Sequence, residues 1–163
     1  MGRTVVDLPP DDEEAAIESI SGYCVSIDMT ARNMQDEAKR KGLPWTAAKG
    51  FDTFLPISDF IPKAKIKDPH NVELWLNVNG EERQRDGTGL MLFRIPRMLS
   101  EISRVMKLEE GDLVLTGTPK GVGKVELGDV MTAGVRVGGK ELEEGMIEVG
   151  VREKGGLFEY EET

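Results

Sequence analysis

An Asn-Gly pair at positions 79 and 80, directly after a run of alternating apolar and polar residues, most constrains the fold of this chain. In residues 72–78 every second side chain is Val or Leu, the pattern of a strand with one buried face. Asn-Gly is strongly preferred in two-residue hairpin turns, because both positions need positive φ. The sequence therefore predicts a β-hairpin that returns through residues 81–85.

Similar patterns predict the other elements along the chain. The spacing of apolar residues and the acidic first turn of one segment favour helices over residues 11–20, 30–41 and 95–106. Gly42 follows the second segment, where a helix commonly ends. Strands are expected over residues 22–28, 113–115, 130–137 and 146–151. Residues 54–62 are broken by two prolines and are expected at a sheet edge.

The length of the chain, 163 residues, allows one domain with a hydrophobic core. We expect a single domain over residues 1–163, with a frayed acidic tail from residue 152. The 21 basic and 30 acidic residues give a net charge of −9, which argues against nucleic acid and anionic membranes as partners. No apolar run approaches the roughly 18 residues that a membrane span needs.

A single cysteine and a single histidine limit the possible chemistry. Cys24 lies in an apolar segment and is expected to be a buried thiol in a reducing compartment. His70 follows Pro69 in a loop without a nucleophile elbow, which argues against a Ser-His-Asp triad. The common zinc sites are also excluded, so any metal would be bound by oxygen ligands, as Mg²⁺ or Mn²⁺ is.

The segment 22–54 carries the most promising polar residues. Asp28 ends an alternating strand, and a carboxylate in that position suits a metal ligand, a base or a simple helix cap. Arg32 and Gln35 lie about one and two helical turns beyond it, so both can lean over the same spot. Lys49 follows in an expected Gly-containing loop. Taken alone, each of these is also an ordinary surface residue.

Residues 116–123 contain three glycines and one proline, and they match neither a Walker A loop nor a dinucleotide-binding glycine motif. Two interpretations stay open for this stretch. It is a tight turn, or it is a nest of backbone N–H groups in which Thr118 binds a carboxylate.

Taken in order, five motifs resemble the fumarylacetoacetate hydrolase family, and most closely its acylpyruvase and oxaloacetate decarboxylase branch. They are Asp-Met-Thr-Ala-Arg-x-x-Gln at 28–35, Lys-Gly-Leu-Pro-Trp at 41–45, Lys-x-Phe-Asp-Thr-Phe-x-Pro at 49–56, Val-Asn-Gly at 78–80 and Leu-Thr-Gly-Thr-Pro-x-Gly-Val-Gly at 115–123. The resemblance runs from about residue 22 to residue 123 and more loosely to residue 151.

The resemblance implies an α+β, β-rich fold: a mixed β-roll with peripheral helices. It also implies a homodimer and a Mg²⁺ or Mn²⁺ site. By matching positions, Asp28 is implied as a metal ligand and Lys49 as the catalytic lysine. Arg32, Gln35 and Thr118 are implied as substrate-binding residues. The implied reaction is cleavage of a C–C bond in a small 2-keto acid through a pyruvate enolate.

One departure from the family pattern bears on activity. The family's Glu-x-Glu pair of metal ligands, upstream of the strand that ends at Asp28, is not found in this sequence. We therefore expect a member that is incomplete at its N-terminus and that binds Mg²⁺ poorly. The alternatives are a non-catalytic fragment that dimerises with a longer subunit, and a dienoate isomerase or hydratase of the same family. The expected location is cytoplasmic, or mitochondrial if a longer form carries a presequence.

Overall fold

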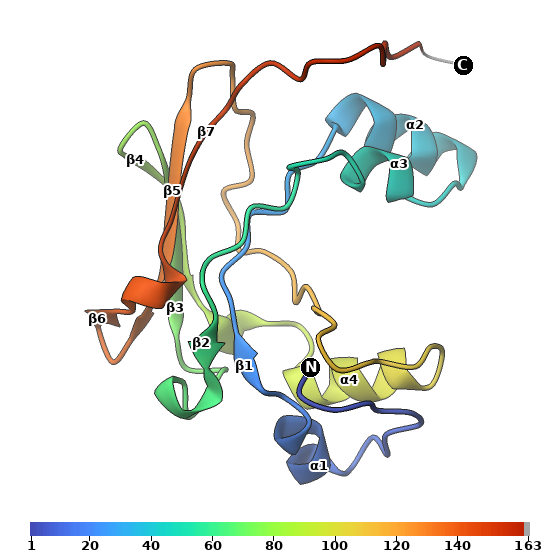
Figure 1. The fold of residues 1–163 in the computed structure, drawn as a ribbon, viewed down its shortest axis with the longest axis vertical. Helices are drawn as coiled ribbons and strands as arrows, with labels where there is room; N and C mark the ends of the chain where they lie inside the picture. The colour runs from blue at the N-terminus through green and yellow to red at the C-terminus, as the bar shows by residue number, and fades with distance from the viewer. Residues whose placement is uncertain (162–163) are drawn as a thin grey trace.

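The structure is a computed structural model that describes residues 1–161, and it has an α+β architecture dominated by one β-sheet (Figure 1). The strand order is β4-β3-β5-β6, with β7 also paired to β5, and every pairing in this sheet is antiparallel. The strands are β3 (Glu73–Val78), β4 (Glu81–Gly87), β5 (Val130–Val137), β6 (Lys140–Glu141) and β7 (Ile147–Gly150). The expected β-rich α+β class is therefore confirmed.

The β3–β4 hairpin forms at the predicted turn. Asn79 has φ 53° and Gly80 has φ 80°, the positive values that this turn requires. The return strand is longer than expected and contains a β-bulge. Leu76 pairs with Gln84 and Asn77 with Glu82, so Arg83 is an extra residue without a partner in the ladder.

The helices form two pairs that lie on the same side of the sheet (Figure 1). One pair is α1 (Glu13–Glu18) with α4 (Ile95–Ser103), and the other is α2 (Arg32–Lys41) with α3 (Thr46–Lys49). A two-stranded ribbon, β1 (Gly22–Tyr23) with β2 (Ile61–Pro62), and 3-10 turns at Lys63–Lys65, Thr88–Leu90 and Glu143–Gly145 complete the elements. No helix in the described part of the chain is long and apolar enough to cross a membrane.

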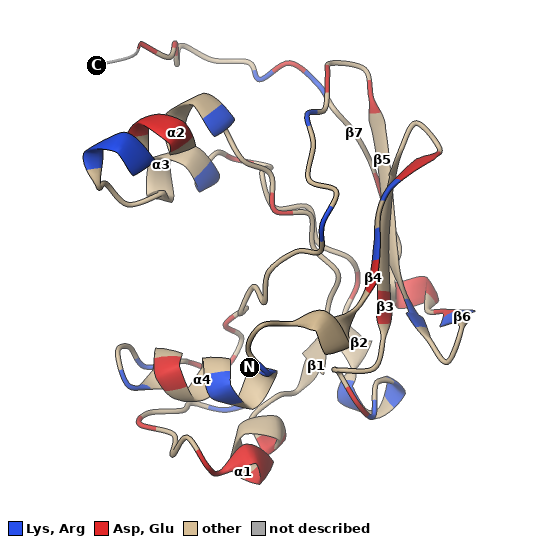
Figure 2. Cartoon of the chain, turned by 180° about the vertical axis from the view of Figure 1, so that it is seen from behind, with Lys and Arg blue, Asp and Glu red and all other residues tan. Residues whose placement is uncertain are grey.

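Charge follows the helix dipoles in two of these helices (Figure 2). The first turn of α1 carries Glu13 and Glu14, and the last turn of α2 carries three basic residues, Lys39, Arg40 and Lys41. Acids near an N-terminus and bases near a C-terminus interact favourably with the helix dipole. The predicted stop at Gly42 is also confirmed, since this residue is the left-handed C-cap of α2.

Two hydrophobic clusters hold these layers together. The first lies under the sheet and joins β3, β5 and β7 to the segment after β1, through Val25, Ile61, Val72, Val135 and Ile147 among others. The second lies between α1, α4 and the N-terminal segment, around Ala16, Ile95 and Leu99. Tyr23 contacts both clusters, so the β1 region connects the sheet to the helices.

Several local expectations were wrong. Residues 113–115 form no strand, and Leu113 and Leu115 are exposed rather than buried. The last helix ends at Ser103, leaving Val105 and Met106 exposed. Cys24 is only half-buried.

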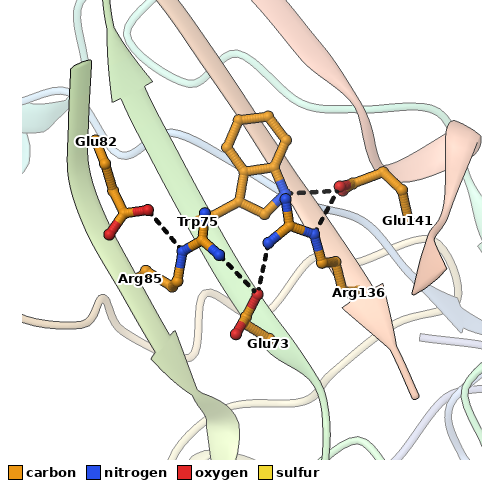
Figure 3. Close-up of polar contacts among 6 residues, drawn as sticks. All are labelled: Glu73, Trp75, Glu82, Arg85, Arg136 and Glu141. Carbon is orange, nitrogen blue, oxygen red and sulfur yellow. Dashed lines mark hydrogen bonds and ion pairs between the residues drawn. The ribbon is translucent and has the colours of Figure 1, made fainter. Parts of the chain in front are cut away.

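The outer face of the sheet carries a polar network that the sequence pattern did not indicate (Figure 3). The Trp75 indole N–H donates to Glu141 Oε1 at 2.8 Å, and the Arg136 guanidinium lies 5.6 Å from the Trp75 ring centre. The Arg136 guanidinium donates hydrogen bonds to both Glu73 and Glu141. These bonds, the one to Glu73 most of all, raise the pKa of Arg136 above its ordinary value. Glycine at position 134 leaves room for this network, because a Cβ there would lie 2.6 Å from Glu141 Oε1 and 2.8 Å from the Trp75 ring. This network covers the indole, so Trp75 is buried although it faces outward.

The N-terminus is tied to the loop after α4. The Met1 ammonium donates to the Asp112 carbonyl at 2.6 Å, and the Gly111 N–H donates to the Met1 carbonyl at 3.0 Å. Val5 and Leu108 also exchange two backbone hydrogen bonds. The first residues of the chain are therefore fixed beside the segment that leads to Thr118.

Candidate functional site

Asp28 is held in place by the backbone on both of its sides. The Ile27 N–H donates to the Pro56 carbonyl at 3.0 Å, and the Met29 N–H donates to the Phe54 carbonyl at 2.9 Å. Val25 and Ile27 are buried while Ser26 and Asp28 are exposed, as the alternation predicted. The Asp28 carboxylate therefore projects from a fixed backbone, away from the buried side chains of Val25 and Ile27.

Lys49 meets this carboxylate directly. Its ammonium Nζ lies 2.6 Å from Asp28 Oδ2, and the two side chains are 29% and 43% exposed. The prediction of a loop at Lys49 was wrong, because Lys49 is the last residue of the short helix α3. The Ala31 N–H donates to the Ala48 carbonyl at 2.9 Å, which joins the start of α2 to the end of α3 and brings Lys49 beside Asp28.

Arg32 and Gln35 lie on the first turn of α2. Arg32 Nη1 donates to Gln35 Oε1 at 3.0 Å. Gln35 is buried and Arg32 is exposed, so the amide orients a guanidinium whose remaining N–H groups are available to a ligand. A guanidinium presents several donors in one plane, which suits the recognition of a carboxylate.

Thr118 lies on the loop between α4 and β5. Its Oγ1 accepts a hydrogen bond from Gln84 Nε2 at 2.9 Å, and the residue itself is exposed. Gly117 and Gly121 have φ of 101° and 99°, which bends the loop back on β4.

All five residues line one cavity of about 1730 Å³: Asp28, Arg32, Gln35, Lys49 and Thr118. The structure thus places the five side chains expected from the sequence on the lining of one cavity, where Asp28 contacts Lys49 and Arg32 contacts Gln35. They come from the segment before α2, from α2, from α3 and from the loop before β5, with the cavity between them.

The lining of the cavity has more basic than acidic residues, although the chain as a whole is acidic. Among its described lining residues, seven are Lys or Arg and four are Asp or Glu, against 21 and 30 in the whole chain. A basic cavity in an acidic protein focuses a positive potential at the site. Cys24 also lines the cavity, but burial raises the pKa of its thiol, so it is a poor nucleophile at neutral pH.

The metal-binding capacity of this site is incomplete. The described residues contain no group of three or more His, Cys, Asp or Glu side chains placed to hold a metal ion. Mg²⁺ and Mn²⁺ take about six oxygen ligands, whereas Asp28 supplies one carboxylate that is already paired with Lys49. The donor set within residues 1–161 therefore does not by itself fit a divalent cation.

The family is decided by the match of residues 1–150 to the model described as fumarylacetoacetate (FAA) hydrolase C-terminal. The chain belongs to the fumarylacetoacetate hydrolase family. Among curated relatives, it is 56% identical over 123 residues to the mitochondrial oxaloacetate tautomerase FAHD1 of Bos taurus, covering 76% of this chain and 56% of that protein. It is 57% identical over 124 residues to the mitochondrial oxaloacetate tautomerase oaa1 of Schizosaccharomyces pombe, with coverage of 76% and 56%.

Solved structures of the family share the fold. The yeast protein ynq8 matches 99% of this chain and 67% of its own, with a TM-score of 0.92 and 37% identity. A fumarylpyruvate hydrolase from Pseudomonas aeruginosa, in complex with Mn²⁺ and pyruvate, matches 94% of this chain and 62% of its own, with a TM-score of 0.84 and 34% identity. The chain spans a little more than half the length of the two curated relatives.

Sequence reasoning missed two residues of strand β4 that also line the cavity, Arg83 and Gln84. Simple alternation would place them on opposite faces of the sheet. The bulge at Arg83 brings both toward the cavity, and nothing local in the sequence shows a bulge there.

Proposed function

We propose that this chain carries the 2-keto acid site of an enzyme that acts on oxaloacetate or a related acylpyruvate through an enolate of the 2-keto acid. The observation that carries the proposal is the Lys49–Asp28 pair, at 2.6 Å, in a basic cavity shared with Arg32, Gln35 and Thr118. The high identity to proteins named oxaloacetate tautomerase supports oxaloacetate as the substrate.

In this proposal each residue has a separate task. Arg32, oriented by Gln35, and the Thr118 hydroxyl bind the carboxylates of the substrate. The Lys49 ammonium lies beside the keto oxygen and stabilises the negative charge that develops there. Tautomerisation removes a proton from C3 and delivers one to the oxygen, whereas decarboxylation releases CO₂ from C3. Both reactions pass through an enolate with its charge on that oxygen, so the same positive charge serves both.

Mg²⁺ or Mn²⁺ is the proposed cofactor, with Asp28 as this chain's ligand and the other ligands from outside the described residues. When bound, the cation would supply additional positive charge to the enolate oxygen. Since one carboxylate binds a hard cation weakly, we expect calorimetry to give millimolar or weaker affinity for Mg²⁺. A micromolar dissociation constant would contradict this.

Asp28→Asn separates the two roles of that carboxylate. Without metal, the substitution frees Lys49 from its partner, so pyruvate should bind several-fold more tightly. In millimolar Mn²⁺ the advantage should be lost, because the cation loses its ligand. The same change in both conditions would show that Asp28 is not a metal ligand.

The reaction is tested by incubating the protein with oxaloacetate while following enol absorbance and pyruvate formation. Acetylpyruvate and a dienoate panel are the comparison substrates, and Lys49→Met is the negative control. Enol turnover or pyruvate release that depends on Lys49 supports the proposal. Turnover of the dienoates alone would instead support the isomerase or hydratase alternative, for which a 5-carboxymethyl-2-hydroxymuconate delta-isomerase from Mycobacterium smegmatis, 39% identical, is a structural precedent.

A role in assembly is the second candidate, because the cavity wall exposes large apolar side chains. Ile57, Phe60, Val122 and Leu127 are 50–67% exposed and line the cavity together. Apolar surface of this kind favours association, so we propose a homodimer or a mixed dimer with a longer subunit. Size-exclusion chromatography with light scattering distinguishes these states from a monomer.

The names of the relatives include the word mitochondrial, which supports the mitochondrial alternative over the expected cytoplasmic location.

A further inference from the structure

Strand β4 forms a wall of the cavity next to Thr118, and its bulge makes this possible. Gln84 and Asp86 pair with Leu76 and Leu74, which pack on the cluster under the sheet. Gln84 and Asp86 therefore face inward, while Arg85 and Glu82 belong to the outer network (Figure 3). The inward residues contact the loop that carries Thr118.

The side-chain amide of Gln84 makes two hydrogen bonds to this loop. Nε2 donates to Thr118 Oγ1 at 2.9 Å and to the Pro119 carbonyl at 2.6 Å. Because a carbonyl only accepts, the contact with Pro119 fixes the nitrogen of the amide on the loop side. Thr118 Oγ1 consequently accepts from Gln84, and its own hydrogen remains free to point into the cavity.

Neighbouring contacts bring the loop close enough for these bonds. Gly121 packs directly on the backbone of β4, where a Cβ would lie 2.0 Å from the Arg83 carbonyl oxygen. On the other side, Lys120 Nζ lies 3.6 Å from Asp86 Oδ2. The loop is thus docked on β4 at three points, and Gln84 alone among them touches the Thr118 hydroxyl.

We propose that Gln84 is a positioning residue that fixes the Thr118 hydroxyl as a donor to the substrate carboxylate. The inference rests on the proposed function for its ligand, but its structural part stands on the contacts of β4. A carboxylate is acceptor-only, so a hydroxyl binds it only when its hydrogen is available. Gln84 ensures this by occupying an acceptor site of Oγ1 instead of taking its hydrogen.

The first test is NMR relaxation of the backbone amides. Gln84→Leu removes both hydrogen bonds to the loop, so the order parameters of residues 116–123 should fall from those of the wild-type protein toward values below about 0.6, the range of flexible backbone. Glu82→Gln is the matched control on the outer face of the same strand and should leave the loop unchanged. The order parameters of β3 and β5 should stay high in both variants, which shows that they are folded. Unchanged loop order parameters in Gln84→Leu would overturn the proposal.

The second test is pyruvate binding followed by NMR titration. Gln84→Leu and Thr118→Val should each weaken binding about five- to twentyfold, since Thr118→Val removes the donor to the carboxylate and Gln84→Leu removes the bond that orients this donor. The double variant should bind within about twofold of Thr118→Val, because Gln84 acts through the hydroxyl. Gln84→Glu should also weaken binding, since the new carboxylate would accept the hydroxyl hydrogen of Thr118.

The outcomes separate the two proposals. Additive losses in the double variant would overturn the positioning role while leaving the proposed function intact. If the wild-type protein bound neither pyruvate nor oxaloacetate, the proposed function would be overturned, and so would the proposal that Thr118 donates to a substrate carboxylate. The relaxation experiment would still decide whether Gln84 holds the loop.

Discussion

Replacing Lys49 with Met should strongly weaken anion binding at the site while changing the stability of the fold very little. At 2.6 Å, a full ion pair is worth about 1.6 kcal/mol at the dielectric constant of water and about 6 kcal/mol at an effective constant of 20. The Asp28 side chain is 43% exposed, so water screens the pair strongly. Measured values for exposed pairs, about 0.2–1 kcal/mol, therefore set the expected loss of unfolding free energy.

The effect on ligand binding should be larger. Lys49 would donate a charge-assisted hydrogen bond to a bound 2-keto acid, and such bonds contribute about 1.5–3 kcal/mol. Pyruvate affinity should therefore fall by about 10- to 150-fold in Lys49→Met. The measurements are urea denaturation for stability and NMR titration with pyruvate for binding.

Lys41→Met is a matched control. Lys41 forms an ion pair of 2.8 Å with Glu37 on α2 and does not line the cavity. It should lose a similar small amount of stability and bind pyruvate like the wild-type protein. Equal pyruvate affinities in the two Met variants would refute the role of Lys49 in binding the ligand. A loss of several kcal/mol of unfolding free energy in Lys49→Met, with pyruvate binding intact, would refute it as well.

Two further predictions concern the fold. His70 is buried, its Nε2 accepts the Ile95 N–H at 3.0 Å, and burial followed by the charge of Arg94 lowers its pKa. The folded state therefore favours the neutral ring of His70. This contribution to the free energy of unfolding is complete above the ordinary pKa near 6.5 and is lost as the pH falls below it. Because His70→Gln removes the titrating group, the unfolding free energy of this variant should decline less between about pH 7.5 and 5 than that of the wild-type protein. Trp75→Phe removes the donor to Glu141 and should cost about 1–2 kcal/mol in urea denaturation, whereas a loss below about 0.3 kcal/mol would show that the bond contributes nothing.

Much of the fold follows from local sequence patterns. The Asn79-Gly80 hairpin, strand β5 and the end of α2 at Gly42 are predictable, because turn chemistry, alternation and a left-handed cap act over a few residues. Residues 113–115 were misassigned for a physical reason. Leu113 and Leu115 line the cavity and are exposed, whereas Val114 between them packs against the cluster around α4, and an apolar run does not distinguish these environments.

The candidate site was predictable in its residues but not in its geometry. Motif resemblance identified Asp28, Lys49 and Thr118, which lie far apart in sequence and line one cavity in the structure. Lys49 was expected in a loop because its segment shows no period, and a helix of only four residues is too short to give a detectable one. Gln84 could not be assigned, since its direction depends on a bulge set by the pairing of two strands.

The attachment of Met1 beside Gly111 and Asp112 has a practical consequence for anyone handling this protein. All three residues border the cavity, so any purification tag placed ahead of Met1 would emerge at its mouth and displace the ammonium from the Asp112 carbonyl. Polyhistidine there would bring imidazoles that bind divalent cations to the border of the cavity and would give a false metal affinity. Metal titrations should therefore be made on protein whose leader has been cleaved.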